Sequence, residues 1–269
     1  MSARAGSVKH ITSTANPVIK AARALHQRKA RTESGLFLAE GHKLALDALA
    51  VGWAPEMILA LEPDRDDAPA AQLAARVRAA GGDVIFTNAA VMEKLARRDN
   101  PQTVIGVFQQ RTTPLSAFTR GTVVALEAPR DPGNVGTIIR TVDGAGGAGV
   151  ILVGTSADPF GVEAVRATMG SLFHVPIART SPEAFFAFLK TWPGAVIGTH
   201  LSATTDFRET GPSEPQMLVM GTEQSGLTDQ MAAACTTLVR IPMAGAADSL
   251  NLAVATALAL YELRRPYLA

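Results

Sequence analysis

The sequence predicts an α/β protein in which a mostly parallel β-sheet domain follows a smaller α/β domain. In residues 121–269, apolar stretches typical of buried strands alternate with helical stretches, which is the pattern of βαβ crossovers. Apolar residues make up 47% of the 269 residues, a normal fraction for a globular protein with a hydrophobic core. The intervening residues 110–120 are polar, contain Pro114 and lack periodicity. We therefore expect a first domain of residues 1–109, a linker of residues 110–120 and a second domain of residues 121–269.

The first domain alternates helical and strand-like segments. Leu44, Leu46 and Leu49 have a spacing that suits a helix. Residues 84–86 and 104–108 have the composition of buried strands. The segments predict a small α/β unit and read, in order, PVIKAARAL, FLAEGHKLALDALA, EMILAL, AAQLAARVRAAG, DVIFTN, AAVMEKLA and TVIGVFQQ.

The second domain begins with a predicted strand, TVVALE, at residues 122–127. A loop, a helix over residues 135–142 and a strand at residues 150–153 follow. Strands separated by helices in this way lie parallel in one sheet, with helices on both faces. The later segments are AFFAFLKT, AVIGTHL, QMLVMGTE, TTLVRIPM and the closing helix SLNLAVATALALYELRR.

Gly144, Gly146 and Gly149 spell a G-x-G-x-x-G motif, but its position argues against a dinucleotide site. A dinucleotide fingerprint lies between a strand and the helix that follows it. Here the order is reversed, because the glycines follow one predicted helix and precede a strand. Glycines at such a place end a helix in a left-handed turn and allow close packing against the sheet. A nicotinamide-dependent oxidoreductase is an alternative that rests on these glycines alone.

Several other classes of protein are disfavoured by composition. Cys235 is the only cysteine, so no intramolecular disulfide is expected and a reducing, cytoplasmic location is favoured. The N-terminus has no apolar region typical of a signal peptide, and the longest apolar run, residues 250–260, is too short to cross a bilayer. The five histidines have no metal-ligand spacing, so no metal centre is expected.

The start of the chain is strongly basic. Seven lysines and arginines precede Glu33, the first acidic residue, although the formal net charge of the whole chain is only +1. Such a basic start suggests a polyanion as a partner. The alternative is a solvated terminus whose charges have no partner.

Polar residues stand at three places where a predicted strand leads into a loop or helix. Asn134 follows the strand at residues 122–127, and Arg140 lies nearly two turns further along the next helix. Glu223 stands in a glycine-containing loop, where it could meet Arg140. Asn251 begins an almost wholly apolar helix, and an amide at the start of a buried helix needs a hydrogen-bond partner. The alternatives are that Asn134 caps its helix, that Arg140 is solvated, that Glu223 belongs to a surface turn, and that Asp248 or Ser249 caps the last helix.

These segments together resemble the TrmH/SpoU branch of the SPOUT superfamily of RNA 2′-O-ribose methyltransferases. The pattern N-x-G-x-x-x-R-T occurs at residues 134–141, G-x-E-x-x-G at residues 221–226, and I-P-M … S-L-N at residues 241–251. Residues 166–177, RATMGSLFHVPI, are similar to a further segment of that family. The first domain is similar to the substrate-binding domain, with an L30e/L7Ae-like fold, that often precedes the catalytic domain.

The resemblance implies a C-terminal trefoil knot, an S-adenosylmethionine cofactor, an rRNA or tRNA substrate, and a homodimer with sites at or near its interface. It implies that the catalytic residues are Arg140, Asn134, Glu223, Ser249 and Asn251. It implies that the cofactor is bound by Gly221, Ile241, Met243, Leu250, Thr199 and Leu201. The basic residues expected to contact RNA phosphates are Lys20, Arg23, Arg28, Lys29 and Arg31.

The implied reaction moves a methyl group from a sulfonium to a ribose 2′-hydroxyl and needs neither a metal nor a redox group. Within the family the counterpart of Arg140 is assigned the role of activating the hydroxyl. A guanidinium is a poor proton acceptor, so we expect Arg140 to stabilise the developing alkoxide or to hold a neighbouring phosphate. Glu223 would orient Arg140, and Asn134, Ser249 and Asn251 would position the ribose. A non-catalytic RNA-binding module of the same fold is the second alternative.

Overall fold

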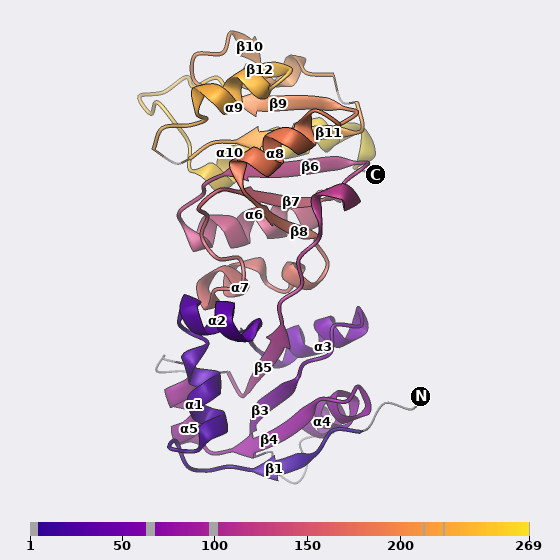
Figure 1. The fold of residues 1–269 in the computed structure, drawn as a ribbon, viewed down its shortest axis with the longest axis vertical. Helices are drawn as coiled ribbons and strands as arrows, with labels where there is room; N and C mark the ends of the chain where they lie inside the picture. The colour runs from indigo at the N-terminus through magenta and orange to yellow at the C-terminus, as the bar shows by residue number, and fades with distance from the viewer. Residues whose placement is uncertain (1–4, 63–67, 97–101, 212, 223, 269) are drawn as a thin grey trace. The chain divides into compact units, whose positions relative to one another are not determined.

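The computed structural model describes residues 5–62, 68–96, 102–211, 213–222 and 224–268. The chain forms two compact units. The first contains Met1–Gln110 and Phe160–Phe173, and the second contains Arg111–Pro159 and His174–Ala269. Each unit is an α/β structure with its own sheet (Figure 1).

The sheet of the first unit has the strand order β1-β4-β3-β5-β2. The pairs β1–β4 and β3–β4 are parallel, whereas β5 lies antiparallel to both β2 and β3. The strands are β1 (Val8–His10), β2 (Leu36–Glu40), β3 (Met57–Leu61), β4 (Asp83–Thr87) and β5 (Val104–Gln109), and the helices are α1 (Pro17–Ala24), α2 (Arg28–Ser34), α3 (His42–Ala50), α4 (Ala68–Ala79) and α5 (Ala89–Ala96).

Helices cover both faces of this sheet. On one face, Ile19 and Ala22 of α1 and Met92 and Leu95 of α5 pack against strand residues such as Ile85. On the other face, residues of α3 and α4 pack against alternate residues of the same strands. This packing follows from the period-2 alternation of strand side chains, and it turns the polar sides of α1 and α5 to solvent.

The first unit also contains α7 (Val162–Thr168), from the segment Phe160–Phe173. The rings of Phe160 and Phe173 pack against that of Phe37 in tilted arrangements, with centroids 5.1 and 6.3 Å from it. The guanidinium of Arg166 donates to the buried carboxylate of Glu40 over 2.7 Å. The sequence pattern assigns this segment to the second domain, because strands alternate with helices on both sides of it. Its aromatic and ionic partners instead group it with the first unit.

The sheet of the second unit has the order β10-β12-β9-β11-β6-β7-β8, and its pairs are parallel. This confirms the predicted α/β class and parallel sheet. The strands are β6 (Thr122–Glu127), β7 (Gly149–Val153), β8 (Ile177–Thr180), β9 (Ala195–Thr199), β10 (Thr205–Asp206), β11 (Gln216–Met220) and β12 (Thr237–Arg240). The helices include α6 (Pro132–Gly144), α8 (Pro182–Leu189), α9 (Asp229–Ala234) and α10 (Leu252–Arg264).

The glycine motif lies where the sequence predicts. α6 ends at Gly144 and β7 begins at Gly149. Gly146 has a φ of 63°, and a Cβ on Gly149 would lie 2.5 Å from the ring of Phe118. These glycines therefore turn the chain and pack it into the sheet, which confirms that the motif is no dinucleotide fingerprint.

In the second unit, α8 and α9 cover one face of the sheet, and α6 and α10 lie behind the other (Figure 1). The expectation that α10 is buried on most faces is wrong for this chain, because Val254 is 49%, Leu258 44% and Tyr261 45% exposed. Across the described residues, no helix has both the length and the apolar character needed to cross a membrane.

Candidate active site

The loop between β6 and α6 places Asn134 at the C-terminal edge of the sheet. Asp131 caps α6, since its side chain accepts a hydrogen bond from the Asn134 backbone N–H over 2.6 Å. Pro132 occupies the first turn, where its missing N–H costs nothing. Asn134 is therefore not the cap, and its side chain has a different contact.

That contact is with Asn251, at the start of α10. The Asn251 Nδ2 donates to Asn134 Oδ1 over 3.0 Å. The Asn251 Oδ1 accepts from the backbone N–H groups of Ala253 and Val254, so Asn251 is the cap of α10. This corrects the alternative that Asp248 or Ser249 provides the cap, and it confirms that the Asn251 amide has a specific partner.

A cavity of about 340 Å³ lies where the chain leaves β9, β11 and β12. Its lining includes the six residues that the sequence assigns to the cofactor: Thr199, Leu201, Gly221, Ile241, Met243 and Leu250. Ser249 and Asp248 also line it, and Ser249 Oγ donates to Asp248 Oδ1 over 3.1 Å. The ends of parallel strands are where ligands of open α/β sheets bind, so this cavity is the candidate site.

The lining combines apolar and polar groups. Leu201 is 76%, Met243 37% and Leu250 36% exposed in the chain by itself, so a ligand in the cavity could cover large apolar side chains. Gly221 has no room for a side chain, because a Cβ there would lie 1.9 Å from the carbonyl carbon of Gly226. Glycine at this position therefore lets the two ends of the loop after β11 pack backbone against backbone.

The loop after β11 is fixed at both ends. Thr222 and Gly226 exchange two backbone hydrogen bonds of 2.9 and 3.1 Å. At its far end, Glu127 Oε2 accepts from the Thr228 backbone N–H over 2.9 Å, and Glu127 Oε1 accepts from Thr228 Oγ1 over 2.7 Å. Glu223, which the sequence analysis assigns to this loop, lies outside the described residues.

Sequence reasoning did not identify Glu127. It ends β6, and it joins the strand that leads to Asn134 to the loop that lines the cavity. The available signal was a carboxylate at the carboxyl end of a buried strand, but its partner is 101 residues away in the sequence. No local pattern links the two residues.

Arg140 lies apart from the cavity lining. It is exposed on α6, and the residues that line the cavity include neither Arg140 nor Asn134. The structure thus brings together Asn134 and Asn251, and separately Ser249 and the six expected cofactor residues. It does not bring Arg140 to the cavity within this chain.

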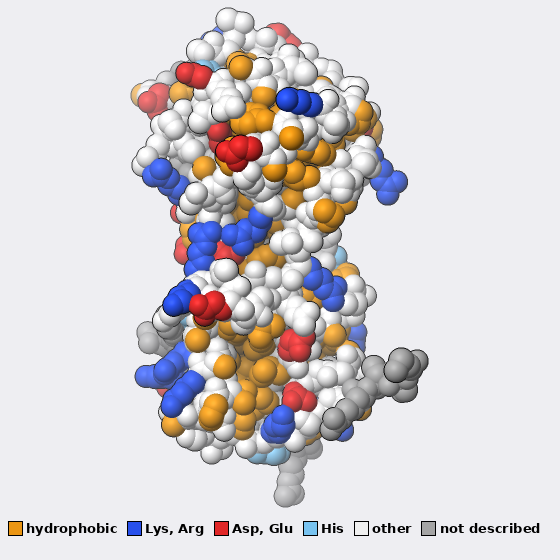
Figure 2. Space-filling view, in the orientation of Figure 1, with side chains coloured by type: hydrophobic (Ala, Val, Ile, Leu, Met, Phe, Trp, Pro, Cys, Tyr) orange, Lys and Arg blue, Asp and Glu red, His pale blue; other side chains and the backbone are white. Residues whose placement is uncertain are grey.

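The basic residues at the start of the chain are divided between surface and core. Lys20, Arg28 and Lys29 are exposed and Arg23 is half-buried. Lys and Arg side chains gather over α1 and α2 in Figure 2. Arg31 is only 5% exposed, and its Nη1 donates to the Leu25 carbonyl over 2.8 Å. Its guanidinium therefore stabilises the turn between α1 and α2, and Arg31 does not belong to the exposed basic surface.

Two protein families match the two parts of the chain. The SpoU rRNA Methylase family matches residues 121–261, and the MRM3-like substrate binding domain matches residues 16–106. The chain is similar to the AdoMet-bound rRNA methyltransferase from Sinorhizobium meliloti, with a TM-score of 0.92 and 47% identity over 97% of this chain and 99% of that one.

Two further relatives cover almost the whole chain. The structure of the SpoU methyltransferase AviRb from Streptomyces viridochromogenes in complex with AdoMet has a TM-score of 0.84 and 29% identity, over 94% of this chain and 99% of that one. The 23S rRNA (guanosine(2553)-2′-O)-methyltransferase RlmP of Bacillus subtilis (strain 168) is 30% identical over 96% of this chain and 100% of its own length. The chain belongs to the SpoU rRNA methylase family.

Proposed function

We infer that the protein is an S-adenosylmethionine-dependent RNA methyltransferase that transfers a methyl group to a ribose 2′-hydroxyl of rRNA or tRNA. The observation that carries this inference is the cavity at the ends of β9, β11 and β12, whose lining holds all six expected cofactor residues. The Asn134–Asn251 pair is joined directly to the cavity, because Asn251 follows Ser249 and Leu250 in the sequence and both of these residues line the cavity.

The cavity residues fit S-adenosylmethionine. Leu201, Met243 and Leu250 would cover its apolar parts, and backbone groups of Gly221 and Ile241, which line the cavity, would bind its polar atoms. When bound, the cofactor supplies a methyl group activated by a sulfonium centre. The chain's own residues must therefore bind the cofactor, orient the ribose and stabilise the charge that develops on its oxygen.

The five residues expected to be catalytic would act on the acceptor. Arg140 would stabilise the developing alkoxide or hold a neighbouring phosphate, and Glu223 would orient Arg140. Asn134, Ser249 and Asn251 would position the ribose through hydrogen bonds. The bond between the two asparagine amides supports this assignment, because it fixes the orientation of both side chains.

A methyl-transfer assay separates this function from its alternatives. We expect label from S-adenosyl[methyl-³H]methionine to enter RNA when the protein is incubated with total RNA from cells that lack its gene. RNA that binds without becoming labelled would favour the non-catalytic RNA-binding module. Calorimetry with NAD and with S-adenosylmethionine tests the oxidoreductase, because binding of NAD alone would exclude the methyltransferase.

We propose that two copies of the chain pair through the exposed face of α10. This face carries Val254, Leu258 and Tyr261, and beside it a hollow of about 500 Å³ is lined mainly by apolar side chains, including Phe207 and Leu268. α10 packs on α6, the helix that carries Arg140. A second copy seated on α10 would therefore bring Arg140 close to the interface, where it could complete a site.

The oligomeric state tests this pairing. Sedimentation analysis should give a dimer for the unaltered chain and a monomer for Leu258→Asp, because a buried, unpaired carboxylate is costly. Val51→Asp is the matched control, since Val51 is 42% exposed on the first unit. A monomer at tens of micromolar without any substitution would refute the proposal.

We also propose several features of the chain that the sequence analysis predicts. They are the domain boundaries 1–109, 110–120 and 121–269, apart from the segment Phe160–Phe173 that groups with the first unit, the L30e-like fold of the first domain, the trefoil knot and a cytoplasmic location. The exposed basic residues of α1 and α2 would bind RNA phosphates, and their side chains support this by gathering on one side of the first unit (Figure 2). Neutralising these residues together should weaken RNA binding and flatten its salt dependence.

A further inference from the structure

We propose that α1 and α5 together form a pocket that binds the sugar–phosphate backbone of the RNA substrate, with Lys94 as a cation that completes it. The proposal rests on the RNA methyltransferase function inferred above. The pocket has a volume of about 550 Å³ and is lined by Lys20, Arg23, Ala24, Gln27, Glu93 and Lys94. Sequence reasoning did not identify Lys94, because it lies more than 60 residues after the basic start of the chain.

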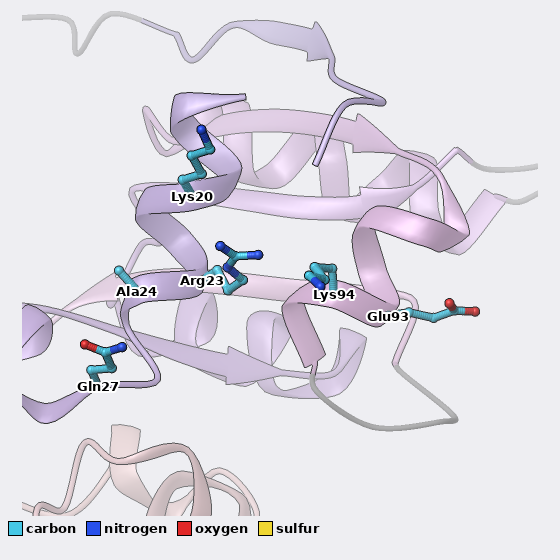
Figure 3. A pocket seen from close by; sticks show the side chains of 6 residues that line it. All are labelled: Lys20, Arg23, Ala24, Gln27, Glu93 and Lys94. Carbon is cyan, nitrogen blue, oxygen red and sulfur yellow. The ribbon is translucent and has the colours of Figure 1, made fainter. Parts of the chain in front are cut away.

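Helix periodicity creates the pocket. Lys20, Arg23 and Gln27 have the spacing i, i+3, i+7, so their side chains follow one side of α1 and its C-terminal turn. Ile19 and Ala22 are buried in the core. On α5, Met92 and Leu95 are buried, which leaves Glu93 and Lys94 exposed. Figure 3 shows Arg23 and Lys94 on neighbouring helices, with the Glu93 carboxylate directed away from them.

Within the described residues, the salt bridges of the chain include none made by Lys20, Arg23 or Lys94, whereas Lys9 pairs with Asp83 at 2.8 Å and Lys43 with Asp47 at 2.5 Å. Three cations held together without a carboxylate partner repel one another, and an anion relieves that repulsion. The geometry therefore favours a polyanionic ligand over a neutral one.

The lining indicates which part of an RNA binds. A guanidinium can hold a phosphate through two hydrogen bonds, and lysine ammonium groups attract it as point charges. The Gln27 amide can donate to a phosphate or exchange hydrogen bonds with a 2′-hydroxyl. The lining contains no aromatic side chain on which a base could stack. The pocket should thus bind backbone without reading sequence, and its volume is in the range of about 300–1,000 Å³ that holds ligands larger than a single phosphate.

The pocket is tested by salt-dependent binding of a 23S rRNA transcript to the full chain. We expect Lys94→Ala and Arg23→Ala each to weaken binding about three- to tenfold and to reduce the slope of log Kd against log salt by about 1. The KM for RNA should rise, while kcat at saturating RNA and the affinity for S-adenosylmethionine stay unchanged. Arg76→Ala is the control, because Arg76 is exposed on α4, which covers the opposite face of the same sheet.

The outcomes separate this pocket from the overall function. Lys94→Ala with unaltered affinity and salt slope would refute the pocket even if the unaltered chain methylates RNA. An absence of methyl transfer by the unaltered chain would refute the function. The salt dependence of RNA binding by the variants would still show whether the pocket binds RNA. Tripolyphosphate that binds as tightly as the transcript and displaces it fully would show that the pocket takes a free anion, which would also overturn the proposal.

Discussion

The side-chain amide of Asn251 donates to the side-chain oxygen of Asn134 over 3.0 Å, across 117 residues of sequence. The bond joins the first turns of α10 and α6, the two helices that lie together behind the sheet of the second unit. Both helix N-termini carry backbone N–H groups and a partial positive charge. Their junction is therefore suited to a group on which negative charge develops, such as a ribose oxygen that is losing its proton.

Three substitutions distinguish the role of this hydrogen bond in catalysis from its role in stability. Asn251→Asp keeps an oxygen that can cap α10 but removes the N–H that binds Asn134. We expect its methyl transfer to fall sharply while its melting temperature stays near that of the unaltered chain. Asn134→Ala should behave in the same way. Asn251→Ala also loses the cap, so it should lose about 1 kcal/mol of stability as well. Full transfer activity in Asn251→Asp would contradict the role of the pair.

Arg140→Ala should abolish methyl transfer and leave S-adenosylmethionine binding within about tenfold, because the residue acts on the acceptor. Its exposed position on α6 predicts little change in stability. Single-turnover rates and calorimetry measure the two effects separately. An equal loss of transfer and cofactor affinity would place Arg140 in the cofactor site, which the cavity lining does not support.

Glu127→Gln should loosen the loop that lines the cavity. Its carboxylate accepts from both the N–H and the hydroxyl of Thr228, and a glutamine would present a donor to one of those two donors. We expect weaker S-adenosylmethionine binding and faster amide hydrogen exchange in residues 221–228. Glu127→Asp, which keeps the charge on a shorter side chain, should recover part of the affinity. Unchanged exchange in Glu127→Gln would show that the bond does not hold the loop.

The Cys235 thiol should react slowly with alkylating reagents in the folded protein. Burial raises its pKa to about 11, and the nearby charge of Glu127 adds to that increase. The thiolate is the reactive form, so the alkylation rate should rise as the pH approaches 11, whereas the unfolded chain should react readily near pH 8.5. Rapid alkylation of the folded protein at pH 8 would contradict the raised pKa of this half-buried thiol.

Local patterns predicted much of the fold. The alternation of strands and helices gave the parallel sheet of the second unit, and the position of Gly144 between a helix and a strand excluded the dinucleotide fingerprint. The polar start of an apolar helix correctly indicated that Asn251 has a specific partner.

Features that depend on contacts between distant segments could not be read from local patterns. Arg31 belongs to a basic stretch, yet it is buried because the turn after α1 supplies a carbonyl for its guanidinium. Lys94 and Arg23 come from different helices, and only packing brings them to one pocket. The exposed apolar face of α10 could not be predicted either, because an apolar helix in a sequence does not reveal whether its own chain or another covers it.

The position of the methyl group that the protein adds to RNA tests the proposed reaction most directly. Total RNA from cells without the gene is treated with the protein and labelled S-adenosylmethionine, digested to nucleosides and analysed by mass spectrometry. We predict label in a single 2′-O-methylated nucleoside, and no transfer by Asn251→Asp. Label on a base, or no label in RNA that the protein binds tightly, would contradict this prediction.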